Sequence, residues 1–247
     1  MAGHSKWANI KHRKAAQDKK RAKIFTRLIR ELMVAARHGG GEPDTNPTLR
    51  LAIDNARAEN MPKDTMDRAI KRGTGEIEGA DYEETVYEGY GPGNVAFMVK
   101  CLTDNKTRTV ANVRTIFSKK GGRFGETVNW MFEEKGQILF TSDVADEETI
   151  MLTAIEAGAE DVKASDDGYE ILTTKDDFGD VSKTLKEAFG KPEEADLTFI
   201  ANQNQPVEDP ETAEKLMNLI EALEDDDDVQ VVCTNADIPD EVAEKVA

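Results

Sequence analysis

The sequence has few of the residues on which most catalytic and metal sites depend. Its 247 residues include 2 cysteines and 3 histidines, and 6% are aromatic. Cys101 and Cys233 form no CxxC pair, so we expect two reduced, buried thiols and no zinc site. No GxSxG, HExxH, GxGxxG or EF-hand pattern occurs. These absences predict a protein that is not an enzyme and that holds no metal and no cofactor.

Long apolar runs are also missing. No stretch of about 18 apolar residues occurs, so we expect no membrane span. The first residues carry charge but lack the apolar h-region of a signal peptide. We therefore expect a cytoplasmic protein without a membrane partner. The chain is long enough to bury a substantial core in about one to three domains.

Positive charge is scarce after the first third of the chain. The net charge is −17, yet residues 1–72 hold 17 Lys and Arg against 8 Asp and Glu, a net of +9. Residues 73–247 hold 15 against 41, a net of −26. This separation indicates that one end of the chain meets a polyanion while the remainder repels it.

The basic third has the pattern of three short amphipathic helices. Apolar residues recur with a helical period over residues 24–36, and three consecutive glycines then end the helix. Asn46 followed by Pro47 predicts the N-cap and first residue of a second helix, and Pro62 begins a third. Residues 1–20 hold few large apolar groups. We expect them to form an arm attached to a small helical bundle.

The composition turns acidic near residue 79, where we place the first domain boundary. Beyond it, a helix is followed by a strand four times. The helices start near Thr107, Glu147, Asp176 and Pro210. The strands that follow them lie near Val128–Glu133, with a continuation to Gln137–Thr141, and near Asp161–Ala164, Leu197–Ala201 and Val229–Cys233. Further strands lie at Val95–Leu102 and Tyr169–Thr173. This rhythm predicts two units in which helices cover one face of a mainly antiparallel sheet, an α+β fold.

Two short motifs resemble binding sites but have simpler interpretations. The loop GYGPGN, Gly89–Asn94, is followed by a predicted strand and lacks the helix N-terminus that would cradle a phosphate, so we expect a turn. The run EDDDD, Glu224–Asp228, could suggest a metal site. Adjacent carboxylates repel one another and point apart, so we expect a solvated turn between a helix and a strand.

The first thirty residues carry ten Lys and Arg and one acid, Asp18. The predicted nucleic-acid-binding residues are Lys6, Trp7, Lys11, His12, Arg13, Lys14, Lys19, Lys20, Arg21, Lys23, Arg27 and Arg30. A salt-bridged surface helix would carry acids among these cations. The rings of Trp7 and His12 can stack on bases, and phosphates relieve the repulsion among the cations. Nothing marks a recognition helix, so we expect binding of low sequence specificity.

The opening MAGHSKWANIKHRKAAQDKKRAKIFTRLIREL resembles the YebC/PmpR family. The agreement continues through YEGYGPGNVAFMVKCLTDNKTRTVANVRTIFSKKGG and AEKLMNLIEALEDDDDVQVV and spans essentially the whole chain. The resemblance implies an N-terminal three-helix bundle over residues 1–79 and two ferredoxin-like α/β domains, the third inserted in the second. These domains map onto residues 80–134 with 206–247, and onto 135–205. One loop, GRFGETVNWMF, is shorter than the family's usual GxLGxxGSVxxxF.

The resemblance implies two different functions. Bacterial members are usually described as DNA-binding transcriptional regulators. A mitochondrial relative is a translational activator, and bacterial members are also linked to ribosomes stalled on proline-rich sequences. Three hypotheses stay open: a transcriptional regulator on duplex DNA, a translation factor on ribosomal RNA or the ribosome, and a protein–protein module whose basic arm docks onto acidic surfaces. Charge counting does not separate the first two, and it predicts no oligomeric state.

Overall fold

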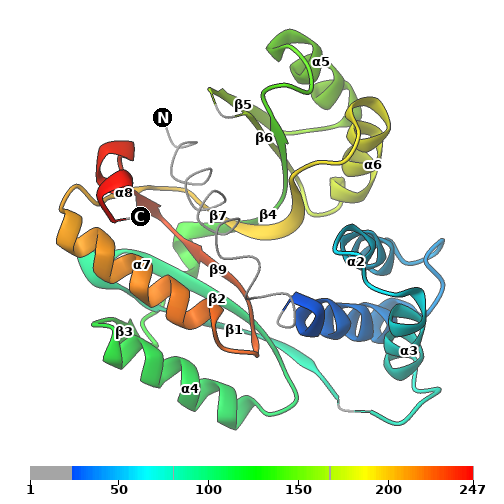
Figure 1. The fold of residues 1–247 in the computed structure, drawn as a ribbon, viewed down its shortest axis with the longest axis horizontal. Coiled ribbons are helices and arrows are strands. Elements are labelled where there is room, and N and C mark those ends of the chain that lie inside the picture. Colours follow the sequence, from blue (N-terminus) through cyan, green and yellow to red (C-terminus); the bar gives the residue numbers. More distant parts are fainter. Residues whose placement is uncertain (1–23, 80, 167, 247) are drawn as a thin grey trace.

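The computed structural model describes residues 24–79, 81–166 and 168–246, whose elements form three packed units (Figure 1). A helical unit at one end contains a helix over residues 24–39, α2 (Pro47–Ala58) and α3 (Lys63–Gly73). Two sheet-containing units follow it. None of the helices in these ranges is long and apolar enough to cross a membrane.

Local capping sets the shape of the helical unit. Asn46 is buried, and its Oδ1 accepts a hydrogen bond from the Leu49 amide at 3.0 Å, as predicted for the N-cap of α2. The Asn46 Nδ2 also donates to the carbonyl oxygens of Ala35 and Gly40, both at 2.8 Å. This one side chain therefore ties the start of α2 to the end of the preceding helix.

The second unit is a four-stranded antiparallel sheet with the order β3-β1-β2-β9. Its strands are β1 (Glu83–Tyr90), β2 (Ala96–Thr103), β3 (Arg123–Phe124) and β9 (Val229–Thr234). Helices α4 (Lys106–Lys119) and α7 (Pro210–Glu224) cover one face (Figure 1). Phe97, Phe117 and Leu219 are fully buried between that face and the helices. The unit also contains η1 (Pro92–Asn94), the short parallel strands β8 (Gln205–Pro206) and β10 (Ala236–Asp237), and α8 (Asp240–Val246).

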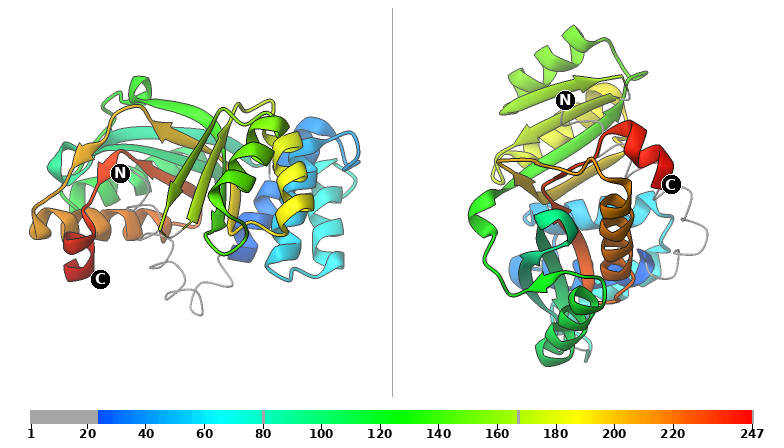
Figure 2. Two further views of the ribbon diagram at one scale, coloured as in Figure 1. Left: turned by 90° about the horizontal axis from the view of Figure 1, so that it is seen from above. Right: turned by 90° about the vertical axis from the view of Figure 1, so that its left-hand side faces the viewer.

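The third unit repeats this layering with the strand order β5-β6-β4-β7. Its strands are β4 (Phe132–Thr141), β5 (Asp161–Ser165), β6 (Gly168–Thr173) and β7 (Glu194–Ala201), and its helices are α5 (Glu147–Ala157) and α6 (Phe178–Phe189). Figure 2 shows α5 and α6 side by side on one face of this sheet. On the second unit's sheet, the face opposite its helices is partly covered, because Phe199 and Ala201 of β7 pack with Ala96 and Met98 of β2.

The predicted α+β class and antiparallel sheets are confirmed, and the predicted helix starts lie within about two residues of the observed ones. Both cysteines are free and buried, as expected, and burial raises the pKa of Cys101 to about 12. The predicted strand at residues 128–133 is wrong over its first four residues, whereas its continuation to residue 141 is confirmed. Residues Asn129–Met131 form the 3-10 turn η2, and β4 begins only at Phe132. The three domain boundaries stay a prediction.

The strand prediction failed at this point because a carboxylate distant in the sequence accepts hydrogen bonds from the backbone amides of this segment. The Oε2 of Glu88 on β1 accepts hydrogen bonds from the amides of Val128 and Asn129, at 2.7 and 2.8 Å. These two amides are therefore unavailable to a neighbouring strand. A contact over 40 residues leaves no trace in the local sequence pattern.

We expect Asn46→Ala to lower the free energy of unfolding by about 2–3 kcal/mol, because it removes a helix cap and two buried hydrogen bonds. Urea denaturation followed by circular dichroism measures the change. Asn218→Ala, at an exposed position of α7, is the matched control and should stay within about 0.5 kcal/mol of the parent. Equal effects of the two substitutions would contradict the role assigned to Asn46.

Candidate nucleic-acid interface

Ten of the twelve predicted nucleic-acid-binding residues lie outside the described residues. They are Lys6, Trp7, Lys11, His12, Arg13, Lys14, Lys19, Lys20, Arg21 and Lys23. The structure places the other two, Arg27 and Arg30, on the helix over residues 24–39. Arg27 is partly buried and Arg30 is buried, so neither is a freely exposed cation.

The described part of the helical unit has little excess charge. Residues 24–72 carry nine Lys and Arg against seven Asp and Glu. Residues 1–23 carry eight Lys and Arg against one acid, so most of the net charge of +9 lies there. The exposed cations of the unit, such as Arg57 and Arg68, have acids within one helical turn. The largest excess of positive charge in this third therefore lies in its first 23 residues.

A shallow open groove lies between the C-terminal ends of the first helix and α3. Its volume is about 510 Å³, and its lining includes Arg37 and Arg72. Glu78 and Asp81 also line it, and Arg37 forms an ion pair with Asp81. Because opposite charges balance within the groove, it has no net attraction for a phosphate.

Arg30 is used inside the protein. Its Nη1 donates to the Leu102 carbonyl at 3.2 Å, to the Asp227 carbonyl, and to Asp228 Oδ1 at 3.0 Å. Its guanidinium carbon also lies 4.9 Å from the centre of the Tyr82 ring. A phosphate contact would compete with these buried partners, so we leave Arg30 out of the interface proposed below.

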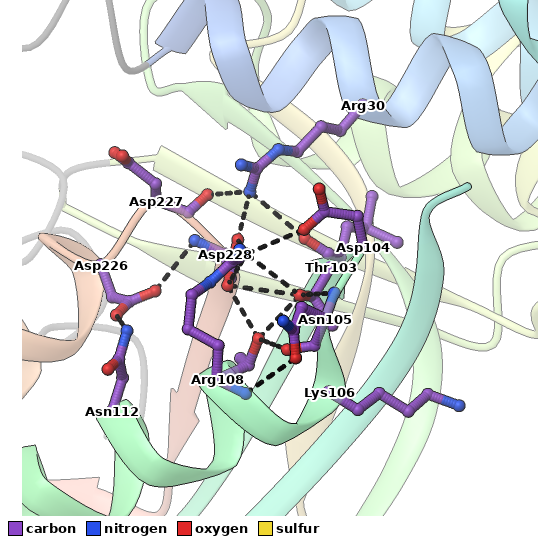
Figure 3. A network of polar contacts seen from close by, with 12 residues as sticks. Arg30, Thr103, Asp104, Asn105, Lys106, Arg108, Asn112, Asp226, Asp227 and Asp228 are labelled. Carbon is purple, nitrogen blue, oxygen red and sulfur yellow. Dashed lines mark hydrogen bonds and ion pairs between the residues drawn. The ribbon is translucent and has the colours of Figure 1, made fainter. Parts of the chain in front are cut away.

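The carboxylate of Asp228 is the centre of a polar network that joins two units (Figure 3). Arg30 approaches it from the helical unit and Arg108 from α4, with Arg108 Nη2 at 2.8 Å from Oδ2. Thr109 Oγ1 donates to the same oxygen at 2.7 Å, and Thr103 Oγ1 lies 3.3 Å from it. The helical unit is thus fixed to the second unit by a charged contact rather than by apolar packing alone.

Asp228 corrects the interpretation of the acidic run EDDDD. The run does form a turn between α7 and β9, as predicted, but Asp228 is only 3% exposed and is not solvated. Burial alone would raise its pKa. The hydrogen bonds from Arg108 and Thr109 and the positive charges of Arg108 and Arg30 outweigh burial, so the pKa lies below its usual value.

A second polar contact joins the helical unit to the third unit. Asn55 Nδ2 of α2 donates to Asp196 Oδ1 of β7 at 3.1 Å. Burial raises the pKa of Asp196 to about 8, and the charges of Glu194 and Glu31 add to the rise. Arg27 and the hydrogen bond from Asn55 act in the opposite direction. The predicted binding residue Arg27 therefore lies in the field of an acidic cluster at this contact.

Comparison with known protein families matches residues 5–76 to the TACO1/YebC protein N-terminal domain and residues 82–236 to the TACO1/YebC second and third domain. The chain belongs to the TACO1/YebC family. The resemblance noted from the sequence is thereby confirmed.

Full-length relatives of this TACO1/YebC chain carry one common description. Proteins from Dictyoglomus turgidum and Magnetococcus marinus, 53% and 55% identical over 100% of both chains, are named probable transcriptional regulatory protein. A protein from Thermotoga petrophila with the same name is 52% identical over 100% of this chain and 98% of its own. The crystal structure of a conserved hypothetical protein from Aquifex aeolicus is 43% identical, with a TM-score of 0.83 over 90% of this chain and 93% of that one.

Sequence reasoning found the basic start of this TACO1/YebC chain but missed the Asp228 network. Nothing distinguishes Asp228 from the three aspartates before it except its place next to β9. It also missed that six Lys and Arg and no acid occur between residues 105 and 125. A charge count in a short window would have found that segment.

We expect Asp228→Ala to destabilise the protein by about 3–5 kcal/mol, because it leaves Arg30 buried without its carboxylate. The native pKa of Asp228 is lowered, so its contribution is present above the unfolded pKa of about 3.9 and is lost as the pH falls through the native value. Urea titrations between neutral pH and pH 3 measure this. The difference between variant and parent should shrink below about pH 4.

The neighbouring acid provides the control for this prediction. Asp227 has an exposed side chain, and only its backbone carbonyl accepts from Arg30. Asp227→Ala should therefore change stability by less than about 0.5 kcal/mol. If both alanine variants were equally stable, the network would not be what fixes the helical unit.

We expect Asp196→Asn to stabilise the protein at pH 7 by about 1–2 kcal/mol, a value reduced for its partial exposure. The native carboxyl holds its proton up to about pH 8, whereas the unfolded one loses it near pH 3.9, so parent stability falls as the pH rises between these values. The gain should vanish below pH 4. Asp161→Asn, at an exposed position of β5, is the control and should show no such pH-dependent gain.

Proposed function

We propose that this chain regulates gene expression by binding nucleic acid through its basic N-terminal segment. The observation that carries the proposal is the concentration of eight Lys and Arg against one acid in residues 1–23, beside a net charge of −26 in residues 73–247. The relatives named probable transcriptional regulatory protein support a regulatory role. No catalytic step and no cofactor is part of the proposal.

The charge separation suggests how the segment meets its target. A phosphate backbone attracts the cations and releases its condensed counterions when they bind. The acidic remainder is repelled by the same backbone, so it turns the N-terminal segment toward the target. The helix over residues 24–39 directly follows this segment, and Arg30 fixes that helix to Asp228 of the second unit.

Duplex DNA is the first candidate target, in keeping with the names of the relatives. RNA, including the ribosome, is the second. Trp7 and His12 lie among the cations, and their rings can stack on unpaired bases, which structured RNA exposes more readily than a duplex. The two targets share the same electrostatic mechanism and differ in what the rings can reach.

We expect the intact chain to bind a random duplex with a log–log salt slope of roughly −5, corresponding to about six phosphate contacts. Replacing Lys11, Arg13, Lys14 and Arg21 by Gln should weaken binding and reduce the slope by roughly 3. Fluorescence anisotropy at several salt concentrations measures both quantities. The matched control replaces Arg50, Arg57, Arg68 and Lys71 by Gln and removes the same charge from the described helical surface.

The control should keep most of the affinity and slope. Equal losses in the two variants would overturn the assignment to the N-terminal segment, and an unchanged affinity in both would favour a protein partner for that segment. Sedimentation of DNase-treated lysate then distinguishes the targets. Migration with ribosomes that disappears when residues 1–22 are deleted supports RNA, whereas a preferred duplex sequence with no such migration supports DNA.

A further inference from the structure

A second cationic segment lies within the acidic part of the chain. Residues 105–125 hold six Lys and Arg and no Asp or Glu, although residues 73–247 as a whole hold 15 against 41. The segment comprises α4, the turn after it and the edge strand β3. Figure 1 shows α4 and β3 at the outer side of the second unit, away from α2 and α3.

Two of the six cations lie at the N-terminal end of α4 and form ion pairs there. Lys106 pairs with Glu83, and Arg108 pairs with Asp104 and Asp228. The other four are exposed and gather around the C-terminal end of α4 and the edge strand β3. They are Arg114, Lys119, Lys120 and Arg123. Arg123 pairs with Glu126, and the other three form no ion pair with any residue in the described ranges.

Aromatic rings hold the two arginines of this group. The guanidinium carbon of Arg114 lies 5.3 Å from the centre of the Phe124 ring, and that of Arg123 lies 5.2 Å from the centre of the Tyr90 ring. Tyr90 on β1 is paired with Arg123 across the sheet. Such contacts restrict the long side chains and leave their remaining N–H groups available for an anion.

An exposed tryptophan lies seven residues after Arg123 in the sequence. Trp130 of η2 is 67% exposed, which makes it the most exposed large apolar side chain among the described residues. Its turn is fixed by the two hydrogen bonds that Glu88 accepts from the backbone of residues 128 and 129. The next residue, Met131, has its sulfur 3.9 Å from the Tyr90 hydroxyl, and the Tyr90 ring lies against Arg123. A fixed turn thus presents an open indole, and the neighbouring Met131 connects this turn to Arg123 through Tyr90.

We propose that this edge binds an unpaired stretch of nucleic acid, with a base stacked on Trp130 and phosphates held by Lys119, Lys120 and Arg123. Flat rings beside a cationic groove or edge are the features that bind single strands, and stacking requires a base that is not enclosed in a duplex. The inference rests on the proposed nucleic-acid binding and adds a second contact surface to it. Its substrate class is single-stranded RNA or single-stranded DNA.

The charge pattern favours this occupant over a protein. An apolar protein contact would gain nothing from the exposed cations at the end of α4 and on β3, and those cations would have to be desolvated. A phosphate chain uses the cations and the ring together, because its charges and bases alternate along the strand. The predicted contacts at Trp130 and at Lys119 and Lys120 are separable by substitution.

The test uses the full-length chain with Trp7→Phe, so that Trp130 is the only tryptophan. Its fluorescence is followed while a short oligouridylate, the matching oligothymidylate or a duplex of equal length is added. We expect both single strands to quench Trp130 and the duplex to quench it far less. Equal quenching by the two single strands indicates that the edge does not sense the 2′-hydroxyl, and stronger quenching by oligouridylate indicates that it does.

Affinities measured by anisotropy of labelled oligouridylate complete the test. Trp130→Ala should weaken binding at least about fivefold, while Trp130→Phe keeps most of the affinity. Lys119→Gln with Lys120→Gln should weaken binding and lower its salt dependence. Lys183→Gln with Lys191→Gln, at exposed positions of the third unit, is the matched control and should have little effect. Thermal unfolding checks that each variant stays folded.

An unchanged affinity in Trp130→Ala and in the Lys119 and Lys120 variant would overturn the inference. If the N-terminal substitutions still abolished binding, the proposed function would survive that failure, because its surface is different. A change of sedimentation coefficient in Trp130→Ala without any change in oligonucleotide binding would also overturn it and assign the ring to a protein contact. Quenching by the duplex equal to that by the single strands would remove the stacking role.

Discussion

The buried carboxylate of Asp228 is the contact on which the arrangement of this molecule depends. It accepts from Arg30 of the helical unit and from Arg108 of α4, at 3.0 and 2.8 Å. A carboxylate buried to this extent requires such partners, and the buried Arg30 in turn requires a carboxylate. Arg108 is more exposed and also pairs with Asp104, so the mutual dependence is strongest between Arg30 and Asp228. Their contact fixes the helix over residues 24–39 to the second unit.

This constraint gives the charge separation a structural meaning. The helix that follows the basic segment is fixed to the acidic part of the chain at Arg30, whose charge is used in that contact. The negative charge of Asp228 is likewise compensated, because it forms ion pairs with both Arg30 and Arg108. The cations of residues 1–23 are thus followed by a junction whose own charges are already paired.

Much of the fold could be predicted because local signals agree with the tertiary structure. Asn46 followed by Pro47 marks α2, and the alternation of helices and strands gives the α+β class. The failures have a common physical cause, which is a partner far away in the sequence. Glu88 accepts hydrogen bonds from the amides of residues 128 and 129, so β4 begins later than predicted. Arg30 and Arg108 pair with Asp228, so this aspartate of EDDDD is buried and not solvated as predicted. The basic start was found from composition alone, whereas the surface at β3 needed the structure, which connects the turn of Trp130 to Arg123 through Met131 and Tyr90.

The two cationic surfaces differ in what they can recognise. The N-terminal segment offers charge at a high density, which any phosphate backbone satisfies, so it supplies affinity with little discrimination. The edge at β3 has fewer cations but adds a ring on a fixed turn, and a ring discriminates between paired and unpaired bases. A target that engages both must combine a dense phosphate surface with an accessible single strand. Folded RNA has both features over short distances, whereas an undistorted DNA duplex offers only the first. If one target engages both proposed surfaces, folded RNA meets their requirements better than a duplex does, whereas the N-terminal segment by itself leaves duplex DNA as the first candidate.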